Sequence, residues 1–371
     1  MRKGFASRVA LKSKLHPIES AMRILPLFTL VATVVGFAFS ARSQTSTIQN
    51  QLDKILRNAN FNGSALVSSN DKTLLAAGYG LANHEAGVKN ARSTQHRIGS
   101  ITKQFTAMAI LILEEQGKLN TQSRVGAYLD DVPDTWRALT LHQLLTHTSG
   151  LEHSWQVRTF AQNGGKSKSL DETLNLFFDL PLKFEPGTQF HYSGVGYFLL
   201  AKIIETQAGQ IYDAFLREHI FEPLEMKNTG CDRSDRILSD ASKGYQVNPR
   251  GKRRIAPEFH MALLTGGGNL YSTVQDMQRW DKALREQKLI PQEAYQRMYQ
   301  IEQRNYAYGW TVREQQDERW IFHGGGVPGH TAFFLRNPEK SLCVVLLSNH
   351  RSPKVKPLAF RLAKAVLNQT N

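Results

Sequence analysis

The fragment Ser100-Ile101-Thr102-Lys103 places a hydroxyl and an amine three residues apart. Residues at i and i+3 share one face of a helix, so the two side chains can touch. A serine hydroxyl is a weak nucleophile until a base takes its proton, and a lysine amine is such a base only when it is neutral. The usual lysine pKa of about 10.4 must fall by roughly 3 units for this near pH 7, and burial can lower it that far. The pair therefore indicates acyl-transfer chemistry, although on this fragment alone Ser100 is more simply the cap of a helix.

A helix over Ile101–Gln116 is predicted to position this pair. Free N–H groups and the helix dipole at its start favour the negative charge that develops there during the reaction. Gly117 is a stop signal for the helix. The apolar residues of the segment fall on one face and include Ile101, Phe105, Met108, Ile112 and Leu113.

The rest of the chain is predicted to form a sheet that a helical block interrupts. A helix is expected over residues 44–60, and the strands Gly63–Ser69 and Lys72–Tyr79 follow around a turn. Residues 118–240 are mainly helical, with apolar segments at Leu141–Leu145 and Tyr197–Ala208. A capping box at Ser272 begins another helix.

The C-terminal part returns to strands and closes with a helix. These elements are Tyr308–Arg313, Arg319–His323, Thr331–Leu335, Ser341–Ser348 and the helix Pro357–Leu367. This order predicts an α+β fold, in which an antiparallel sheet is flanked by helices and carries an inserted helical region. Within a domain of residues 44–371, the α/β part covers about 44–98 and 255–371, and the helical part about 99–254.

Several segments resemble, in order, the motifs of the serine β-lactamase-related family. This family includes class C β-lactamases, D-alanyl-D-alanine peptidases and related esterases. Its active-site helix is similar to Arg97–Ala107, and its other motifs are similar to Leu144–Gly150 (LLTHTSG), Phe184–Gly187 with Tyr192–Gly194, Phe221–Met226, Gly267–Thr273 and His323–Gly326. The resemblance covers about residues 50–350 and implies a β-lactamase/transpeptidase-like fold.

The resemblance also implies catalytic roles. Ser100 would be acylated, and the base would be the pair of Lys103 and Tyr192, since the identity of the acylation base is disputed for such enzymes. Tyr192 would pass a proton to the leaving group and later help to activate water. His147, in the LLTHTSG segment, is expected to hydrogen-bond a loop rather than to act in catalysis.

The third motif would form the substrate-binding side of the site. His323 would stand where other members carry a lysine, and it can donate a hydrogen bond to a substrate carboxylate or carbonyl. The backbone N–H groups of Ser100 and Gly326 would form an oxyanion hole, at about 3 kcal/mol per donor. Gly324, Gly325 and Gly326 suit a strand edge that meets a substrate, because they carry no side chains.

One departure from the family pattern bears on the substrate. The second motif is usually Y-x-N, whereas this chain has Tyr192-Ser193-Gly194. In the β-lactamases of this family that Asn contacts the amide side chain of the substrate, which Gly194 cannot do. The missing Asn and the histidine at 323 favour an esterase or D-amino-acid peptidase that hydrolyses an ester or amide carbonyl. The alternatives are a class C-like β-lactamase and a non-hydrolytic, penicillin-recognising sensor or binding protein.

The N-terminal region predicts export. Met22-Arg23 precedes an apolar stretch, Ile24–Phe39, and Ala41-Arg42-Ser43 suits a cleavage site. The stretch is shorter than the roughly 20 residues that span a bilayer. Residues 1–43 are therefore interpreted as a signal peptide region, with Met22 as an alternative start of translation, and the protein is expected to be periplasmic or secreted. An uncleaved anchor is the alternative.

Composition excludes other functions more than it indicates one. The net charge of the chain is +14, but residues beyond 43 carry 39 basic against 31 acidic side chains, and only residues 250–254 form a basic run. We expect a solvated loop there and no nucleic-acid partner. No metal or cofactor motif is present, so the expected partner is a small molecule or peptide, including one derived from the cell wall. The oligomeric state and any pairing of Cys231 with Cys343 stay open.

Overall fold

The computed structural model describes residues 47–370, apart from 234–237, 249, 316–317 and 353. The predicted signal peptide, residues 1–43, lies outside the described residues and stays a prediction. Among the helices of the described part, none is both long and apolar enough to cross a membrane.

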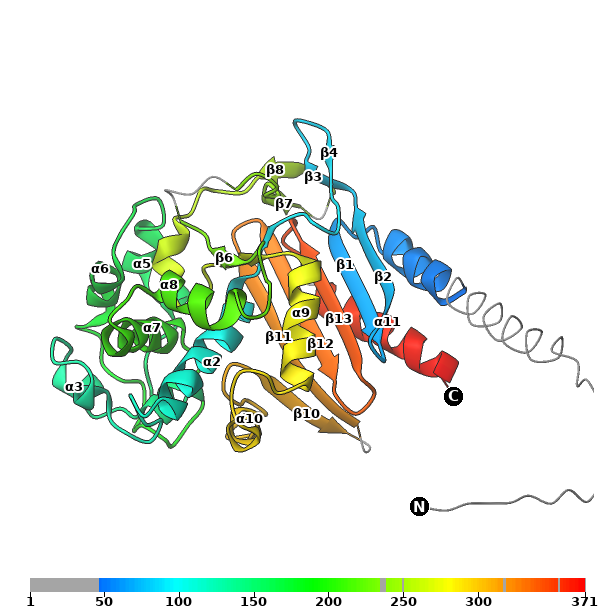
Figure 1. Cartoon of the computed structure of the whole chain (residues 1–371). Helices are drawn as coiled ribbons and strands as arrows, with labels where there is room; N and C mark the ends of the chain where they lie inside the picture. The colour runs from blue at the N-terminus through cyan, green and yellow to red at the C-terminus, as the bar shows by residue number, and fades with distance from the viewer. Residues whose placement is uncertain (1–46, 234–237, 249, 316–317, 353, 371) are drawn as a thin grey trace, which may run out of the picture. The chain divides into compact units, whose positions relative to one another are not determined.

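A six-stranded antiparallel sheet forms the centre of the described fold (Figure 1). Its order is β10-β11-β12-β13-β1-β2. The strands are β1 (Gly63–Ser69), β2 (Lys72–Tyr79), β10 (Thr311–Gln315), β11 (Glu318–Val327), β12 (His330–Asn337) and β13 (Leu342–Ser348). The predicted α+β fold with an antiparallel sheet is confirmed.

The hairpin of β1 and β2 has the predicted boundaries. Ser69 pairs with Lys72 across a two-residue turn. Asn70 and Asp71 there have positive φ angles of 48° and 61°. Two consecutive positive φ values match the right-handed twist of the strands, and Asn and Asp adopt them more readily than most residues. The local sequence therefore determines this hairpin by itself.

The two faces of the sheet belong to two different cores. Along β13, Val344 and Leu346 pack with the helix at residues 47–58 and with α11 (Val355–Thr370). Val345 and Leu347 point to the opposite face and join the larger core of the helical region. Because successive strand residues alternate in direction, the same alternation sends His323 of β11 toward the helical region, whereas Phe322 points away from it.

The helical region lies mainly on one side of the sheet. Its longer helices are α2 (Thr102–Glu115), α7 (Gly194–Ala208), α9 (Val274–Arg285) and α10 (Gln292–Met298). Shorter ones are α3 (Asp134–Arg137), α4 (Leu141–Leu145), α5 (Arg158–Gln162), α6 (Leu170–Leu174) and α8 (Tyr212–Leu216). Small sheets pair β3 (Leu81–Asn83) with β4 (Val88–Lys89), β5 (His96–Arg97) with β9 (Leu270–Ser272) and β6 (Gly230–Cys231), and β7 (Tyr245–Val247) with β8 (Arg253–Ile255).

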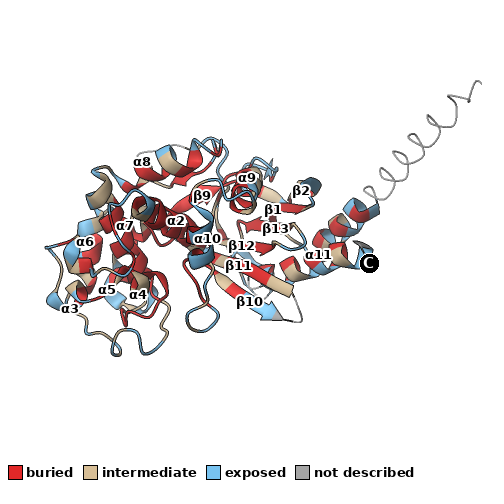
Figure 2. Cartoon of the chain, turned by 60° about the horizontal axis from the view of Figure 1, so that its bottom comes forward, coloured by how far each residue is buried: buried red, intermediate tan, exposed pale blue. Residues whose placement is uncertain are grey.

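Helix α2 is buried on every side rather than on one apolar face (Figure 2). All residues from Thr102 to Leu113 are buried, including the polar ones. The apolar face expected from the sequence is buried, and the remaining faces of the helix are buried as well. Polar side chains are accommodated because they find partners: Thr106 donates to the carbonyl of Gly266 at 2.6 Å, and Gln104 accepts from the indole of Trp280 at 3.0 Å.

Two predicted boundaries are also corrected. Strand β11 was expected to end at His323, but it continues to Val327 because its three glycines stay paired with β12. The cap of α9 is Thr273, whose hydroxyl accepts from the N–H of Asp276 at 3.1 Å. Ser272 cannot cap it because it still belongs to β9, opposite His96.

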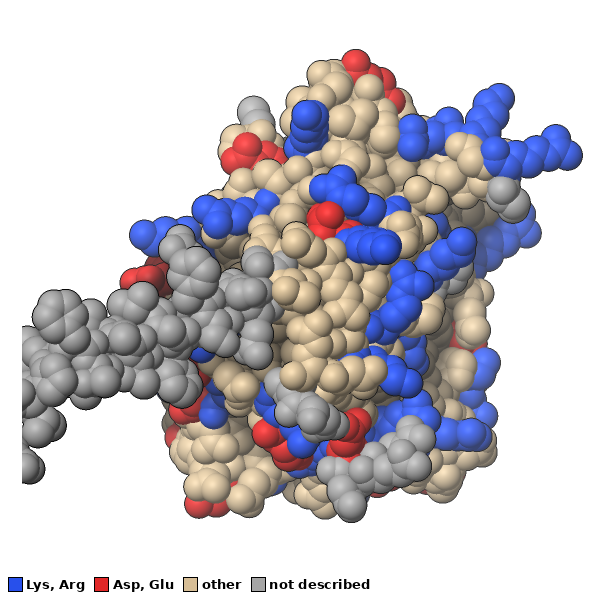
Figure 3. Space-filling view, turned by 90° about the vertical axis from the view of Figure 1, so that its right-hand side faces the viewer, with Lys and Arg blue, Asp and Glu red and all other residues tan. Residues whose placement is uncertain are grey.

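The basic run lies in a hairpin. Arg253–Ile255 forms β8, whose residues are exposed and paired with β7. On the face drawn in Figure 3, Lys and Arg side chains lie more densely toward one edge, and acidic side chains lie among them. Cys231 and Cys343 are both buried free thiols, so the two do not pair.

Candidate active site

Ser100 lies in the 3-10 turn η1 (Gly99–Ile101), which leads directly into α2. Its side chain is partly exposed, whereas Lys103, one turn further on, is only 2% exposed. The Lys103 Nζ lies 3.3 Å from the Ser100 Oγ. The predicted contact between amine and hydroxyl is therefore present, with the hydroxyl on the open side and the amine behind it.

The environment of Lys103 favours the neutral amine. Burial lowers its pKa to about 7, and no carboxylate is among the causes of the change. The Nζ donates to the carbonyl of Gly267 at 2.7 Å. It also lies 5.0 Å from the centre of the Tyr192 ring. A neutral amine can donate to Gly267 and keep its lone pair for the proton of Ser100, which is the arrangement that a general base requires.

Tyr192 completes the group of residues around the nucleophile. Its side chain is partly exposed, and its phenol hydrogen-bonds Ser100. Burial of the ring raises the pKa of Tyr192 well above its usual value, despite the opposing effect of that hydrogen bond. The phenol therefore keeps its proton at neutral pH, which suits a proton donor better than a base.

His323 reaches the same site from β11. Its ring centre lies 6.2 Å from that of Tyr192. The Nδ1 lies 2.6 Å from the carbonyl of Gly324, which can only accept, so Nδ1 carries the proton. The Nε2 then accepts from the hydroxyl of Tyr306 at 3.0 Å. Burial, together with the charge of Lys103, lowers the pKa of His323 to about 3, so the ring is neutral and both its nitrogens are engaged within the protein.

The three glycines of β11 allow the strand to approach Ser100. A Cβ on Gly325 would collide with the carbonyl of Ile98, and it would lie 3.1 Å from the N atom of Ser100. A Cβ on Gly99 would lie 2.6 Å from the N atom of Gly326. Gly326 itself is exposed, with open space where a side chain would be. The backbone N atoms of Ser100 and Gly326 thus belong to adjoining segments beside the open side of the site.

The order of these motifs and their convergence at one site match a known protein family. The model of the Beta-lactamase family matches residues 49–368. This chain belongs to the beta-lactamase family. The resemblance drawn from the sequence motifs is thereby confirmed.

Curated relatives of this beta-lactamase-family chain span most of its length. "Protein flp" of Staphylococcus aureus (strain MW2) is 28% identical over 345 residues, which cover 87% of this chain and 68% of the relative. "Putative penicillin-binding protein PbpX" of Bacillus subtilis (strain 168) is 30% identical over 265 residues, which cover 71% of this chain and 65% of the relative.

Solved structures share the beta-lactamase-family fold. The octameric penicillin-binding protein homologue from Pyrococcus abyssi has a TM-score of 0.76 and 25% identity, and the match covers 87% of this chain and 77% of that one. A D-amino acid amidase from Ochrobactrum anthropi SV3 has a TM-score of 0.77 over 87% of this chain and 99% of that one. At 21% identity this second likeness shows the fold alone.

In this beta-lactamase-family chain, the LLTHTSG segment holds Tyr192 in place. His147 accepts through Nδ1 from the N–H of Ser193 at 3.2 Å, and its carbonyl accepts from the N–H of His191 at 2.9 Å. Its ring centre lies 4.2 Å from that of Tyr192. These contacts clamp the residues on both sides of the phenol, so the expected hydrogen-bonding role of His147 is present.

His147 is held in an unusual state. Its φ of 60° is in the left-handed region, which is costly for a residue with a side chain. Burial lowers its pKa well below the usual value. Its Nε2 is buried without a hydrogen-bond partner among the described residues. The family's histidine is thus a neutral positioning residue, which the segment's resemblance alone did not reveal.

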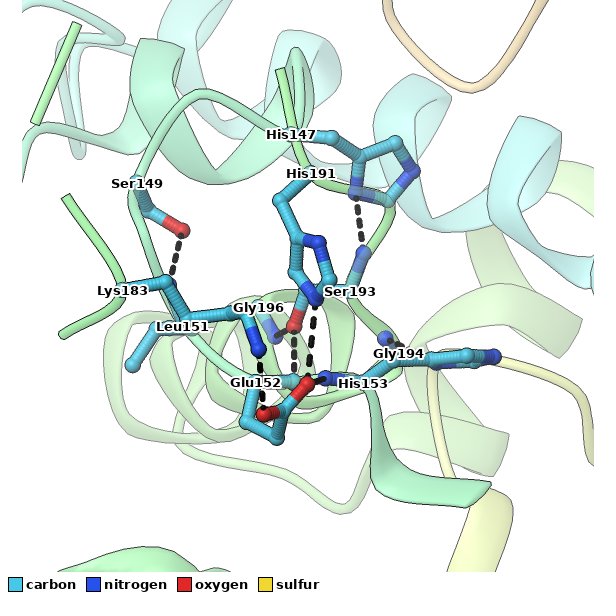
Figure 4. A network of polar contacts seen from close by, with 10 residues as sticks. All are labelled: His147, Ser149, Leu151, Glu152, His153, Lys183, His191, Ser193, Gly194 and Gly196. Atoms are coloured by element: carbon cyan, nitrogen blue, oxygen red, sulfur yellow. Dashed lines mark hydrogen bonds and ion pairs between the residues drawn. The ribbon is translucent and has the colours of Figure 1, made fainter. Parts of the chain in front are cut away.

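Two further contributors to the site were not predicted. The carbonyl of Gly267 orients Lys103, and a Cβ at that position would lie 2.7 Å from the ring of Phe198. The loop at Glu152 and His153 also contacts the second motif (Figure 4): Glu152 pairs with Lys183 at 2.9 Å and with His191 at 3.0 Å. Both contributions join residues far apart in the chain. Gly267 belongs to a motif that the sequence resemblance located, but its contact with Lys103 was not predicted, and the Glu152 loop has no local sequence signature.

Proposed function

We propose that this protein is a serine hydrolase that forms an acyl-enzyme on Ser100 and hydrolyses an ester or amide carbonyl. The observation that carries the proposal is the state of Lys103. Its amine is almost fully buried, its Nζ is 3.3 Å from the Ser100 Oγ, and burial brings its pKa to about 7. A base with a pKa near the working pH is the most effective general catalyst.

Acylation then proceeds in a defined order. The neutral Lys103 takes the proton of Ser100 as its Oγ attacks the substrate carbonyl carbon. The negative charge that moves to the carbonyl oxygen is stabilised by the N–H groups of Ser100 and Gly326, each worth about 3 kcal/mol. Tyr192 donates its phenolic proton to the leaving oxygen or nitrogen, because its raised pKa keeps that proton available. The proton on Lys103 restores the phenol.

Deacylation reverses these roles with water as the nucleophile. Tyr192 and Lys103 activate a water molecule that attacks the acyl carbonyl, and the Ser100 Oγ leaves with a proton from the same pair. Tyr192 and Lys103 therefore act in both acylation and deacylation, because deacylation follows the acylation path in reverse.

The substrate class rests on the second motif. Gly194 offers no side-chain amide, which favours an esterase or D-amino-acid peptidase over a β-lactamase. A D-amino acid amidase shares the fold, so the fold is compatible with hydrolysis at an amide carbonyl. A substrate derived from the cell wall fits this class.

Covalent labelling tests the nucleophile. The protein is incubated with a fluorophosphonate probe and, separately, with benzylpenicillin, and its intact mass is measured. We expect one adduct on the wild-type protein with at least one of the two and none on Ser100→Ala, which retains the thermal unfolding midpoint. An Ala variant that is labelled at full strength would refute the assignment.

Turnover separates the proposal from its two alternatives. A panel of p-nitrophenyl esters, nitrocefin and D-alanyl peptides is followed from the first turnover. The proposal expects continuous hydrolysis of esters or peptides. Preferential hydrolysis of nitrocefin would indicate a class C-like β-lactamase instead. One equivalent of product followed by arrest on every substrate would indicate a non-hydrolytic sensor.

A further inference from the structure

The loop that contains His153 occupies the place of the missing Asn side chain. A Cβ built on Gly194 would lie 2.7 Å from the Oγ of Ser154, the first residue of the 3-10 turn η3 (Ser154–Gln156). Ser154 is buried, so it has little room to retreat. A side chain at position 194 would therefore displace Ser154, and the loop fills the space beside the second motif.

His153 uses one ring nitrogen for a contact within the protein and leaves the other without a partner among the described residues. Its Nδ1 accepts from the N–H of Gly194 at 3.3 Å, so the neutral ring carries its proton on Nε2. The Nε2 has no hydrogen-bond partner among the residues that the structure describes, and the side chain is partly exposed. In Figure 4 the ring points away from the contacts that Glu152 makes with His191 and Lys183.

The ring also lies beside the catalytic group. Its centre is 5.4 Å from that of Tyr192, with the two rings edge to face. Burial, followed by the charge of Lys103, lowers the pKa of His153 to about 4. The imidazole is therefore neutral at the pH where Lys103 acts as a base, and it offers one fixed N–H next to the phenol.

We propose that the Nε2–H of His153 binds an acceptor oxygen in the acyl part of the substrate, in the role that the side chain at position 194 can no longer fill. This inference rests on the proposed function and specifies its substrate class. An amide side chain both donates and accepts, whereas this imidazole only donates, because Gly194 already occupies its acceptor. The site therefore selects acyl groups that carry a carbonyl or hydroxyl oxygen near the scissile bond.

The same chemistry disfavours a free amino group at that position. An ammonium group needs acceptors, and His153 would present a donor to it. Glu152, the neighbouring carboxylate on the loop, is engaged by Lys183 and His191 on the other side. We therefore expect N-acylated aminoacyl or hydroxyacyl substrates, rather than amides of free amino acids.

A matched pair of esters tests the donor. One is the p-nitrophenyl ester of N-acetyl-D-alanine; the other is p-nitrophenyl 2-methylpentanoate, in which methylene groups replace the amide. The measured quantity is the ratio of the two kcat/KM values for each variant. Comparing this ratio between variants cancels the different intrinsic reactivity of the esters.

Two substitutions separate the functions of the two ring nitrogens. In His153→Asn the side chain still has an acceptor near the Nδ1 position for the N–H of Gly194, but it has no donor at the Nε2 position. In His153→Gln the amide nitrogen can reach the Nε2 position. We expect Asn to lower the ratio about tenfold, the usual effect of one lost hydrogen bond, with the 2-methylpentanoate unaffected. Gln should keep a ratio close to that of the wild type.

Each other outcome has a definite meaning. If Asn leaves the ratio unchanged, or if it slows both esters equally, His153 does not bind the acyl oxygen and the inference is overturned, while the proposed function stands. If the wild-type protein hydrolyses neither ester and forms no adduct with the penicillin or the fluorophosphonate, the proposed function fails and the inference fails with it.

Discussion

Two groups of side chains that include serine and histidine residues lie at the sheet of this protein, and only one of them is arranged for chemistry. The first, here called the His96 cluster, consists of Ser64, His96, Ser242 and His330. The Nε2 of His96 lies 2.9 Å from the Oγ of Ser64, and its Nδ1 lies 2.9 Å from the Oγ of Ser242. Ser242 in turn contacts the Nε2 of His330 at 3.2 Å.

The His96 cluster contains a serine–histidine contact, as many hydrolases do. Ser64, however, is fully buried, and its hydroxyl already donates to the carbonyl of Ala91 at 2.7 Å. Burial lowers the pKa of His96 well below its usual value. The proton of Ser64 is thus committed to a carbonyl, and because Ser64 itself is fully buried, a substrate carbonyl cannot reach its hydroxyl.

The site at Ser100 differs in both respects. Its hydroxyl is partly exposed, and the adjacent Lys103 keeps a lone pair that no donor within the described residues occupies. A nucleophile therefore needs more than a neighbouring base: it needs access and a base whose capacity is unused. Replacing members of the two groups in parallel tests this distinction.

The largest effect is expected from Lys103→Met, which keeps the length and burial of the side chain but removes the base. Turnover should fall by about 10⁴ or more, as for other serine hydrolases that lose a member of their catalytic group. Steady-state kinetics on the best ester of the panel measures it. Ser64→Ala, the matched change in the His96 cluster, should leave turnover unchanged; a loss of similar size there would contradict the comparison.

A somewhat smaller loss is expected from Tyr192→Phe. Removal of the proton donor should lower acylation by about 10²–10⁴, the usual contribution of a general acid or base. Stopped-flow measurement of the acylation phase isolates this step. Tyr212→Phe is the control, because the buried hydroxyl of Tyr212 on α8 contacts Thr106 of α2 at 2.7 Å rather than Ser100. An unchanged acylation rate in Tyr192→Phe would remove the phenol from the mechanism.

A further expectation concerns pH. Below the Lys103 pKa of about 7 the amine is protonated and cannot act as a base. The acylation rate should therefore fall about tenfold for each pH unit below 7 and level off above it. The pKa of His330 is lowered to about 3, so that member of the His96 cluster adds no inflection near neutrality. A rate that is flat between pH 5 and 8 would contradict the assignment of the base.

The same shift affects stability with a defined sign. The unfolded chain holds the Lys103 proton up to about pH 10.4, whereas the folded chain releases it near pH 7. Since the unfolded state binds more protons in this interval, stability should rise from pH 7 toward pH 10 by a few kcal/mol. Urea unfolding measures this, and Lys103→Met should lack the increment. An equal increment in both proteins would show that Lys103 is charged in the fold.

Much of the fold was predictable because its signals are local. The β1–β2 hairpin follows from two β-like runs on either side of the turn residues Asn70 and Asp71, and the structure reproduces its boundaries. The predicted strand β11 ended too early, at His323, because three consecutive glycines are typical of the end of a strand. Only their pairing with β12 and the close approach of Ile98 explain why glycine is needed there.

The residues of the candidate site also differ in whether the local sequence reveals them. Ser100, Lys103, Tyr192 and His323 could be located from motifs, and the structure brings all four together. His153 could not, because its role depends on a contact with Gly194, which is 41 residues further along the chain. The absent Asn at 194 was visible in the sequence, but the loop that replaces it was not, since only tertiary packing places that loop there.

The smallest effect on turnover is expected from His96→Ala, although it removes the centre of its cluster. Ser64 and Ser242 would each lose a buried hydrogen-bond partner, and the imidazole would leave a cavity, so the free energy of unfolding should fall by about 2–4 kcal/mol. Turnover of the folded fraction should stay within about threefold, because among the described residues no hydrogen bond joins this cluster to Ser100. The opposite result is expected for Ser100→Ala, which should lose turnover while its free energy of unfolding stays nearly unchanged. Urea unfolding and turnover are measured on both variants. If His96→Ala loses activity without losing stability, the His96 cluster contributes to catalysis and the comparison fails.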